Sequence, residues 1–92
     1  MAIIKGGSVT GSAVTVKTEI AVGTVNGVND TFSTPTNYVP GSLLVFLNGL
    51  AQSPGASEDY IELTSPQFQF NSPPQVTGSY VDKILVYYQE AV

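Results

Sequence analysis

The stretch that decides the fold is Ala13-Val14-Thr15-Val16-Lys17-Thr18-Glu19-Ile20-Ala21-Val22. Its even positions carry apolar or β-branched side chains, and its odd positions from Thr15 to Glu19 are polar. Successive side chains of a strand point to opposite faces, so this alternation predicts a strand and not a helix. We interpret the following residues as a β-hairpin that turns at Asn26-Gly27 and resumes toward Phe32. The alternative is that Gly23 breaks the strand and residues 25–30 form a longer loop.

Four further stretches predict strands. Residues 43–47 are five consecutive apolar residues between two turn signals, which predicts a strand covered on both faces. Residues 58–64 and 67–70 alternate and are interpreted as half-buried strands, and the prolines near residue 73 predict a loop to about residue 79. Residues 80–89 fit a helical or a strand face, and we choose a strand because Val, Ile and Tyr are crowded there.

These elements fit one small domain. The chain has 92 residues, enough for one hydrophobic core, and valine occurs 12 times, which favours strands. Turn signals recur about every 8–12 residues, as in all-β sandwiches and barrels. We therefore predict an all-β fold, a small antiparallel β-sandwich or jelly-roll-like barrel of about five to seven strands. Residues 1–12 are expected to form an extended N-terminal arm, and residues 13–92 the single β-sandwich domain.

Composition narrows the function. The chain has three lysines, no arginine and a net charge of −4, so it lacks the basic surface that nucleic-acid binding requires. Cysteine and histidine are absent, which removes disulfides, thiol nucleophiles and imidazole acid–base chemistry. The sequence has no membrane-length apolar stretch and no secretory signal, so we expect a soluble mature chain that starts at Met1. We expect no enzyme activity, no cofactor and no membrane partner.

Two groups of side chains are candidate binding sites. Glu58, Asp59 and Glu62 form an acidic cluster, but they lack the spacing of a calcium loop, so a solvated strand edge is the preferred interpretation. Tyrosines are the second group, because aromatic faces suit sugar rings and protein interfaces. Tyr38 and Tyr80 are placed on exposed loops in this hypothesis. Tyr87 and its neighbour Tyr88 must point to opposite faces of a strand.

Several stretches follow one another in a defined order: Asn26 to Phe32, Pro40 to Gly49, Asp59-Tyr60, and Lys83 to Tyr88. They contain a turn of the form NG.N..F, a strand PGSL.V.LNG, a DY step and a closing strand D.I.V.Y. This order resembles a β module of tailed-phage virion proteins that occurs in tail fibres, baseplates and head surfaces. Two departures are a long loop at residues 50–57 and Val81, where the module commonly has glycine.

The resemblance implies a non-enzymatic virion protein made in the host cytoplasm. We expect a head-surface decoration or cement protein in many copies, which binds other copies of itself and other virion proteins. The alternatives are a tail-fibre, baseplate or head-to-tail component, and a glycan-binding adhesion module that recognises a host-surface glycan. The residues before Asn26 are β-prone and flanked by glycines, so they could pair with a sheet edge of a neighbouring subunit. The expected interface residues are Ile3, Ile4, Val14, Val16, Tyr38, Tyr80 and Tyr87.

Overall fold

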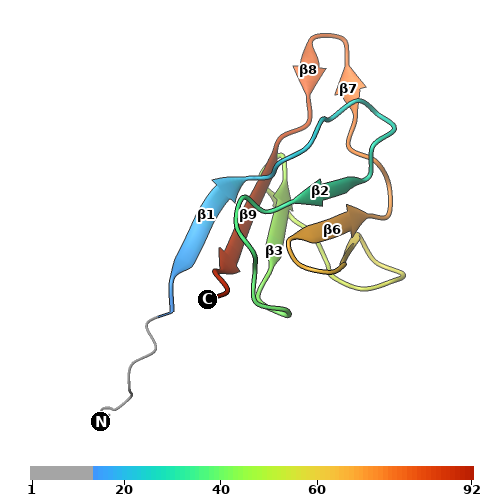
Figure 1. Cartoon of the computed structure of the whole chain (residues 1–92). Helices are drawn as coiled ribbons and strands as arrows, with labels where there is room; N and C mark the ends of the chain where they lie inside the picture. The colour runs from blue at the N-terminus through green and yellow to red at the C-terminus, as the bar shows by residue number, and fades with distance from the viewer. Residues whose placement is uncertain (1–13) are drawn as a thin grey trace, which may run out of the picture.

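The computed structural model describes residues 14–92, and within that range every regular element is a β-strand (Figure 1). The predicted N-terminal arm lies outside the described residues. The all-β prediction is confirmed. Six strands have three residues or more, and three further strands of two residues each raise the number to nine. The strands are β1 (Val16–Ile20), β2 (Thr31–Ser33), β3 (Leu44–Leu47), β4 (Leu50–Ala51), β5 (Tyr60–Glu62), β6 (Gln67–Phe70), β7 (Val76–Thr77), β8 (Tyr80–Val81) and β9 (Ile84–Gln89).

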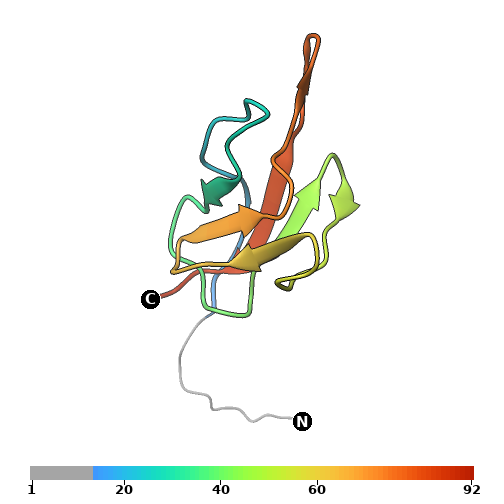
Figure 2. The same ribbon diagram turned by 90° about the vertical axis from the view of Figure 1, so that its right-hand side faces the viewer.

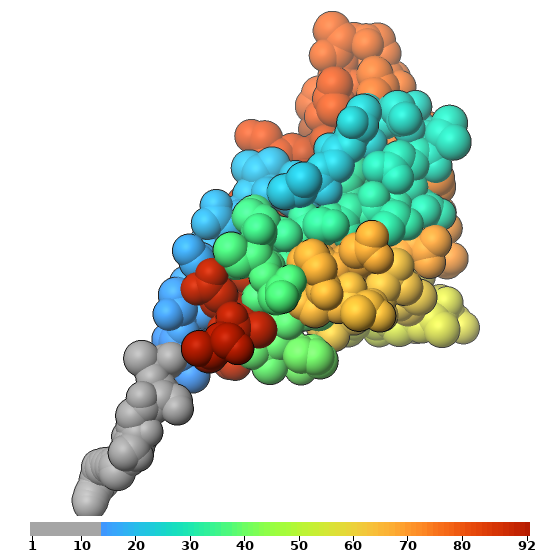
Figure 3. Space-filling model, viewed as in Figure 1, coloured from blue at the N-terminus to red at the C-terminus, as the bar shows by residue number. Residues whose placement is uncertain are grey.

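The strands form two antiparallel sheets and one separate hairpin. The larger sheet has the order β1-β9-β3-β4, and the smaller sheet has the order β2-β6-β5. Figure 2 shows the smaller sheet lying across one face of the larger one. The hairpin of β7 and β8 stands out from the body in Figure 3. The last strand, β9, lies between β1 and β3, so the two ends of the described chain meet in one sheet.

The core fills the space between the two sheets, and strand alternation selects its members. Along β9, Ile84, Val86 and Tyr88 are buried while the residues between them are more exposed. The same alternation buries Phe68 and Phe70 of β6, as the sequence predicts for residues 67–70. Phe32, Phe68 and Phe70 pack with ring centroids 5.7–6.4 Å apart, within the range of favourable aromatic pairs. Segments far apart in sequence therefore share one apolar interior.

The predicted hairpin around Asn26-Gly27 is wrong. β1 pairs with β9, β2 pairs with β6, and the two strands belong to different sheets. β1 ends at Ile20, Gly23 follows with a φ of 143°, and residues 25–30 form a loop, as in the alternative that the sequence left open. The Asn26 side chain holds this loop by accepting hydrogen bonds from the backbone N–H groups of residues 28 and 29, at 2.9 and 2.7 Å. The chain before and after the loop pairs only at the isolated antiparallel bridge between Val22 and Ser33, so the extended hairpin is absent.

The loop predicted for residues 72–79 contains a strand that the sequence did not indicate. β7 pairs with β8 there across a turn with Gly78 at a φ of 62°. The segment of residues 80–89 is a strand, as chosen, but it is interrupted at Asp82-Lys83 between β8 and β9. The turn Asn48-Gly49 has positive φ at both residues, 52° and 84°, which is the geometry of a tight hairpin turn between β3 and β4.

Candidate interaction surface of the larger sheet

The larger sheet packs one face against the core, and no strand of the described residues covers its other face. We call this second face the outer face. Register sets two rows of neighbouring residues across β1, β9 and β3: Ile20, Leu85 and Phe46 form one row, and Thr18, Tyr87 and Leu44 form the other. Val16 lies at the end of the same face, opposite Gln89.

The outer face is apolar and accessible. Val16, Ile20 and Leu44 are 65%, 56% and 57% exposed, and Tyr87 is 37% exposed. The rings of Phe46 and Tyr87 contact each other with their centroids 5.3 Å apart, which holds the two aromatic side chains in place on the surface. Neighbouring exposed apolar side chains of this kind mark interaction sites more often than single exposed residues do.

The predicted burial of residues 43–47 on both faces is wrong for the described chain. Leu43 and Val45 are buried, but Leu44 between them is exposed and Phe46 is half-buried. The five-residue apolar run has the composition of a strand covered on both sides. Only the core side has its cover within residues 14–92, so the outer side leaves apolar surface exposed.

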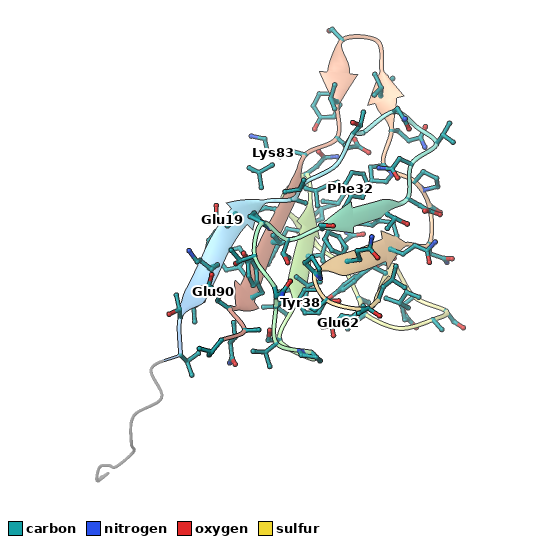
Figure 4. The ribbon with its side chains drawn as sticks, in the orientation of Figure 1. Glu19, Phe32, Tyr38, Glu62, Lys83 and Glu90 are labelled. Carbon is teal, nitrogen blue, oxygen red and sulfur yellow. The ribbon has the colours of Figure 1, made fainter. Side chains whose placement is uncertain are left out.

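In β1 the apolar residues point away from the core side of the sheet. Lys17 and Glu19 share the face of Tyr88 and Val86, their register partners on β9, while Val16, Thr18 and Ile20 share the outer face. Among the strands of residues 14–92, β1 contacts β9 alone, so the smaller sheet does not cover it. Lys17 and Glu19 therefore keep partial access to solvent on the core side, and Figure 4 shows Glu19 on this outermost strand.

β1 is also an edge of the larger sheet. The backbone hydrogen bonds toward β9 involve odd positions, because Ala21 N–H donates to Ile84 at 3.1 Å and the Thr15 carbonyl accepts from Glu90 N–H at 2.8 Å. In an antiparallel ladder such groups alternate along the strand, so the N–H and C=O groups of the even positions point to the open side. Val22, just beyond β1, exchanges hydrogen bonds on that side with Ser33 of β2, at 2.7 and 3.0 Å. Within the described part of the chain no strand pairs on that side with Val16 to Ile20. An exposed edge of this kind is a template for pairing with another strand.

Of the seven predicted interface residues, four are exposed, two lie outside the described residues, and Tyr38 is buried. Val14, Val16, Tyr80 and Tyr87 are exposed, and Val16 and Tyr87 lie together on the outer face. Tyr80 lies instead on the β7–β8 hairpin, where its hydroxyl donates to Asn48 Oδ1 at 2.9 Å. Ile3 and Ile4 lie outside the described residues.

The exposure expected for Tyr38 is wrong. Its side chain is 1% exposed, and its hydroxyl lies 2.8 Å and 2.5 Å from the carbonyl oxygens of Leu63 and Gln67 (Figure 4). Burial, reinforced by the nearby carboxylate of Glu62, raises the pKa of Tyr38 to about 12. This tyrosine stabilises the fold and leaves no ring face for a sugar. Its local sequence carried no sign of burial, because the covering residues come from a distant segment.

Two carboxylates of the acidic cluster, those of Asp59 and Glu62, accept hydrogen bonds from the backbone. Glu62 accepts hydrogen bonds from the N–H groups of Gly41 and Leu43, at 2.8 and 3.3 Å. Asp59 accepts one from Ser53 N–H at 2.9 Å. Within residues 14–92 there is no group of three or more His, Cys, Asp or Glu side chains arranged to hold a metal ion.

A shallow hollow of about 220 Å³ lies beside β5 and β6, with Asp30, Tyr60 and Asn71 among its lining residues. Asp30 accepts a hydrogen bond from the hydroxyl of Thr31 at 3.0 Å, and the Tyr60 hydroxyl is turned inward to the Leu43 carbonyl at 2.8 Å. The lining residues thus do not place an acid beside a base or a nucleophile. Residues 14–92 also contain no helix with the length and apolarity to cross a bilayer.

The outer face is the candidate site that the sequence did not identify as a whole. The sequence contained signals for this face, because β1 and β3 both carry more apolar side chains than the one core buries. The sequence did not show the register that places β1, β9 and β3 side by side. The chain matches no protein-family model, and no curated protein or solved structure is significantly similar to it.

Proposed function

We propose that this protein is a non-enzymatic structural subunit that binds another protein through the outer face of its larger sheet. The observation that carries the proposal is the group of exposed apolar side chains on the outer face of β1, β9 and β3, namely Val16, Ile20, Tyr87 and Leu44. None of the residues that form the face is a carboxylate or an amine. The partner that fits is a protein surface of the same apolar character, since burying such side chains stabilises a complex by about 25 cal/mol per Å² before the costs of association.

We propose a tailed-phage particle as the setting and a head-surface decoration protein in many copies as the role. The order of the motifs from Asn26 to Tyr88 supports this setting. Those motifs supply the turn and strand residues of the domain: Asn48-Gly49 turns between β3 and β4, and Lys83 to Tyr88 lead into and form most of the central strand β9. The same stretches also carry half of the outer face, since Leu44, Phe46, Leu85 and Tyr87 belong to them.

Counting copies on purified particles tests this setting. Peptides of this chain would be quantified by mass spectrometry against the major shell protein of the same particles. Hundreds of copies per particle are expected for a decoration protein, whereas about three to twelve would assign the chain to the tail, whose symmetry is rotational. A chain that is made in the cell but absent from the particles would refute the virion role.

A matched pair of variants tests the outer face itself. Leu44→Lys places a charge on the β3 part of the outer face, and Val28→Lys places the same charge on the loop before β2, where Val28 is 80% exposed. Both side chains are exposed, so both variants should fold with stability within about 0.5 kcal/mol of the wild type. We expect particles that lack the chain to bind added wild type and Val28→Lys, and not to bind Leu44→Lys. Equal binding of both variants would exclude the outer face as the docking surface.

A further inference from the structure

The open edge of β1 carries a sequence that is complementary to itself. β1 has the sequence Val16-Lys17-Thr18-Glu19-Ile20, with Thr18 at its centre. If two copies align antiparallel about Thr18, Lys17 of each copy lies opposite Glu19 of the other, and Val16 lies opposite Ile20. Unlike charges then face each other twice, and apolar side chains meet on the outer face.

The backbone fits the same alignment. The N–H and C=O groups of Val16, Thr18 and Ile20 point away from β9, as the hydrogen bonds of Ala21 and Thr15 show. In an antiparallel pair, residues with outward groups must lie opposite each other to exchange hydrogen bonds. Alignment about Thr18 meets this condition, because it places Thr18 opposite Thr18 and Val16 opposite Ile20.

Charge selects this register over its neighbours. A shift of two residues keeps the hydrogen-bonding condition, but it places Lys17 opposite Lys17 in one direction and Glu19 opposite Glu19 in the other. Like charges directly opposite each other are destabilising. A lysine on an edge strand ordinarily prevents pairing, and here the facing glutamate removes that obstacle in one register only.

We propose that two copies of this chain form a two-fold dimer by antiparallel pairing of their β1 edges about Thr18. The two four-stranded sheets become one continuous sheet, and the outer faces of both copies join through Val16 and Ile20. The contact is self-complementary and closes after two copies, as a two-fold interface does. The dimer uses the strand edge and not the outer face, so it is independent of the partner proposed above and is measured on the purified protein alone.

Charge reversal tests the dimer. Lys17→Glu and Glu19→Lys each replace the two unlike pairs by two like pairs, so we expect each variant to raise the dimer Kd by at least about tenfold. An equimolar mixture of the two variants restores unlike pairs at both contacts and should form a heterodimer with nearly wild-type affinity. The double variant should form a homodimer for the same reason. Sedimentation velocity and native mass spectrometry of the full chain give these values.

The mixture separates pairing from a general loss of folding, because a misfolded variant would not be rescued by its counterpart. Leu44→Lys should leave the Kd unchanged. The proposal is overturned if the wild type is a monomer at about 100 µM, a concentration at which even weak dimers form. It is also overturned if the wild type dimerises but neither charge reversal weakens it, or if Leu44→Lys abolishes the dimer.

Single cysteines test the register, since the natural chain has none. Thr18→Cys places two sulfurs opposite each other, with Cα atoms about 5.5 Å apart, within disulfide range. Val16→Cys places the two cysteines about 13 Å apart along the strands, beyond that range. We expect mild oxidation to cross-link Thr18→Cys and not Val16→Cys, and a mixture of Val16→Cys with Ile20→Cys to give the mixed dimer. Cross-linking of Val16→Cys with itself, at a yield above that of Thr18→Cys, would refute the proposed alignment.

Discussion

Asn48 and Asp82 are joined by a hydrogen bond of 2.9 Å from Asn48 Nδ2 to Asp82 Oδ1, across 34 positions of the sequence. Asn48 Oδ1 accepts from Lys83 N–H at 2.8 Å, and Asp82 Oδ2 accepts from Gln75 N–H at 2.8 Å. The pair therefore ties the turn between β3 and β4 to the base of the β7–β8 hairpin. This explains how β9 enters the centre of the larger sheet in a fixed register.

Asp82→Ala should loosen the hairpin. The change leaves Asn48 Nδ2 and Gln75 N–H without their acceptor, but both groups are near solvent, so we expect a loss of only about 1 kcal/mol in unfolding free energy. Hydrogen exchange should accelerate at Gln75 and in β8 more than in β6. Urea titration gives the global value, and unchanged exchange at Gln75 would contradict the assigned role.

Acid should remove the same contribution in the wild type. The hydrogen bonds from Asn48 and Gln75 hold the pKa of Asp82 below its usual 3.8. A carboxyl group whose pKa is lowered in the folded state stabilises the protein above the unfolded pKa, and that stability is lost as the pH falls through the folded pKa. The difference in stability between wild type and Asp82→Ala should therefore shrink below pH 3.8. A difference that stays constant would show that the charge of Asp82 has no part in it.

Tyr38→Phe should destabilise the fold by about 1–2 kcal/mol, because the carbonyl oxygens of Leu63 and Gln67 lose their buried donor. Tyr80→Phe is the matched control: it also removes a hydroxyl that donates a hydrogen bond, but Tyr80 is 56% exposed, so water replaces its hydroxyl. We expect the control to change stability by less than about 0.5 kcal/mol. Equal losses in urea titrations of the two variants would contradict the burial of Tyr38.

Alkali should destabilise the wild type through the same residue. Tyr38 has a pKa of about 12 when folded, against 10.0 for an unperturbed tyrosine. The unfolded chain therefore gives up this proton first, and stability falls as the pH rises from 10 toward 12. Tyr38→Phe should show a smaller fall, with the remainder from Tyr60, whose pKa burial also raises. Unfolding followed by tyrosinate absorbance measures this, and identical alkaline profiles would assign the loss to other groups.

Gly23→Ala should be among the most damaging single changes. A Cβ at this position would lie 2.5 Å from Cδ2 of Phe32, and the φ of 143° is one that side chains rarely adopt. We expect a loss of at least about 2 kcal/mol from the clash and the backbone strain. Gly78→Ala has a φ of 62° and no atom within 4 Å of the new Cβ, so it should cost about 1 kcal/mol. Thermal unfolding of both variants compares them, and similar losses would show that Phe32 moves aside.

The sequence by itself determined that the chain folds from strands and which side chains share a strand face. Period-two alternation is local, so it was sufficient to place Phe68 and Phe70 on one face. Residues 80–89 fitted a helical face as well, so the crowding of Val, Ile and Tyr was also needed to choose the strand that groups Ile84, Val86 and Tyr88 and separates Tyr87 from Tyr88. The sequence also indicated the turn at Asn48-Gly49, because Asn and Gly both tolerate the positive φ that a tight hairpin turn requires.

Only the tertiary structure decided which strands pair and which faces are covered. Asn26-Gly27 could form a hairpin, but β1 pairs with β9 from the other end of the chain, and that choice depends on contacts between distant residues. The burial of Tyr38 and the exposure of Leu44 have the same origin. Alternation along a strand shows that two sets of side chains lie on opposite faces. Which of the two sets is buried depends on where the second sheet packs.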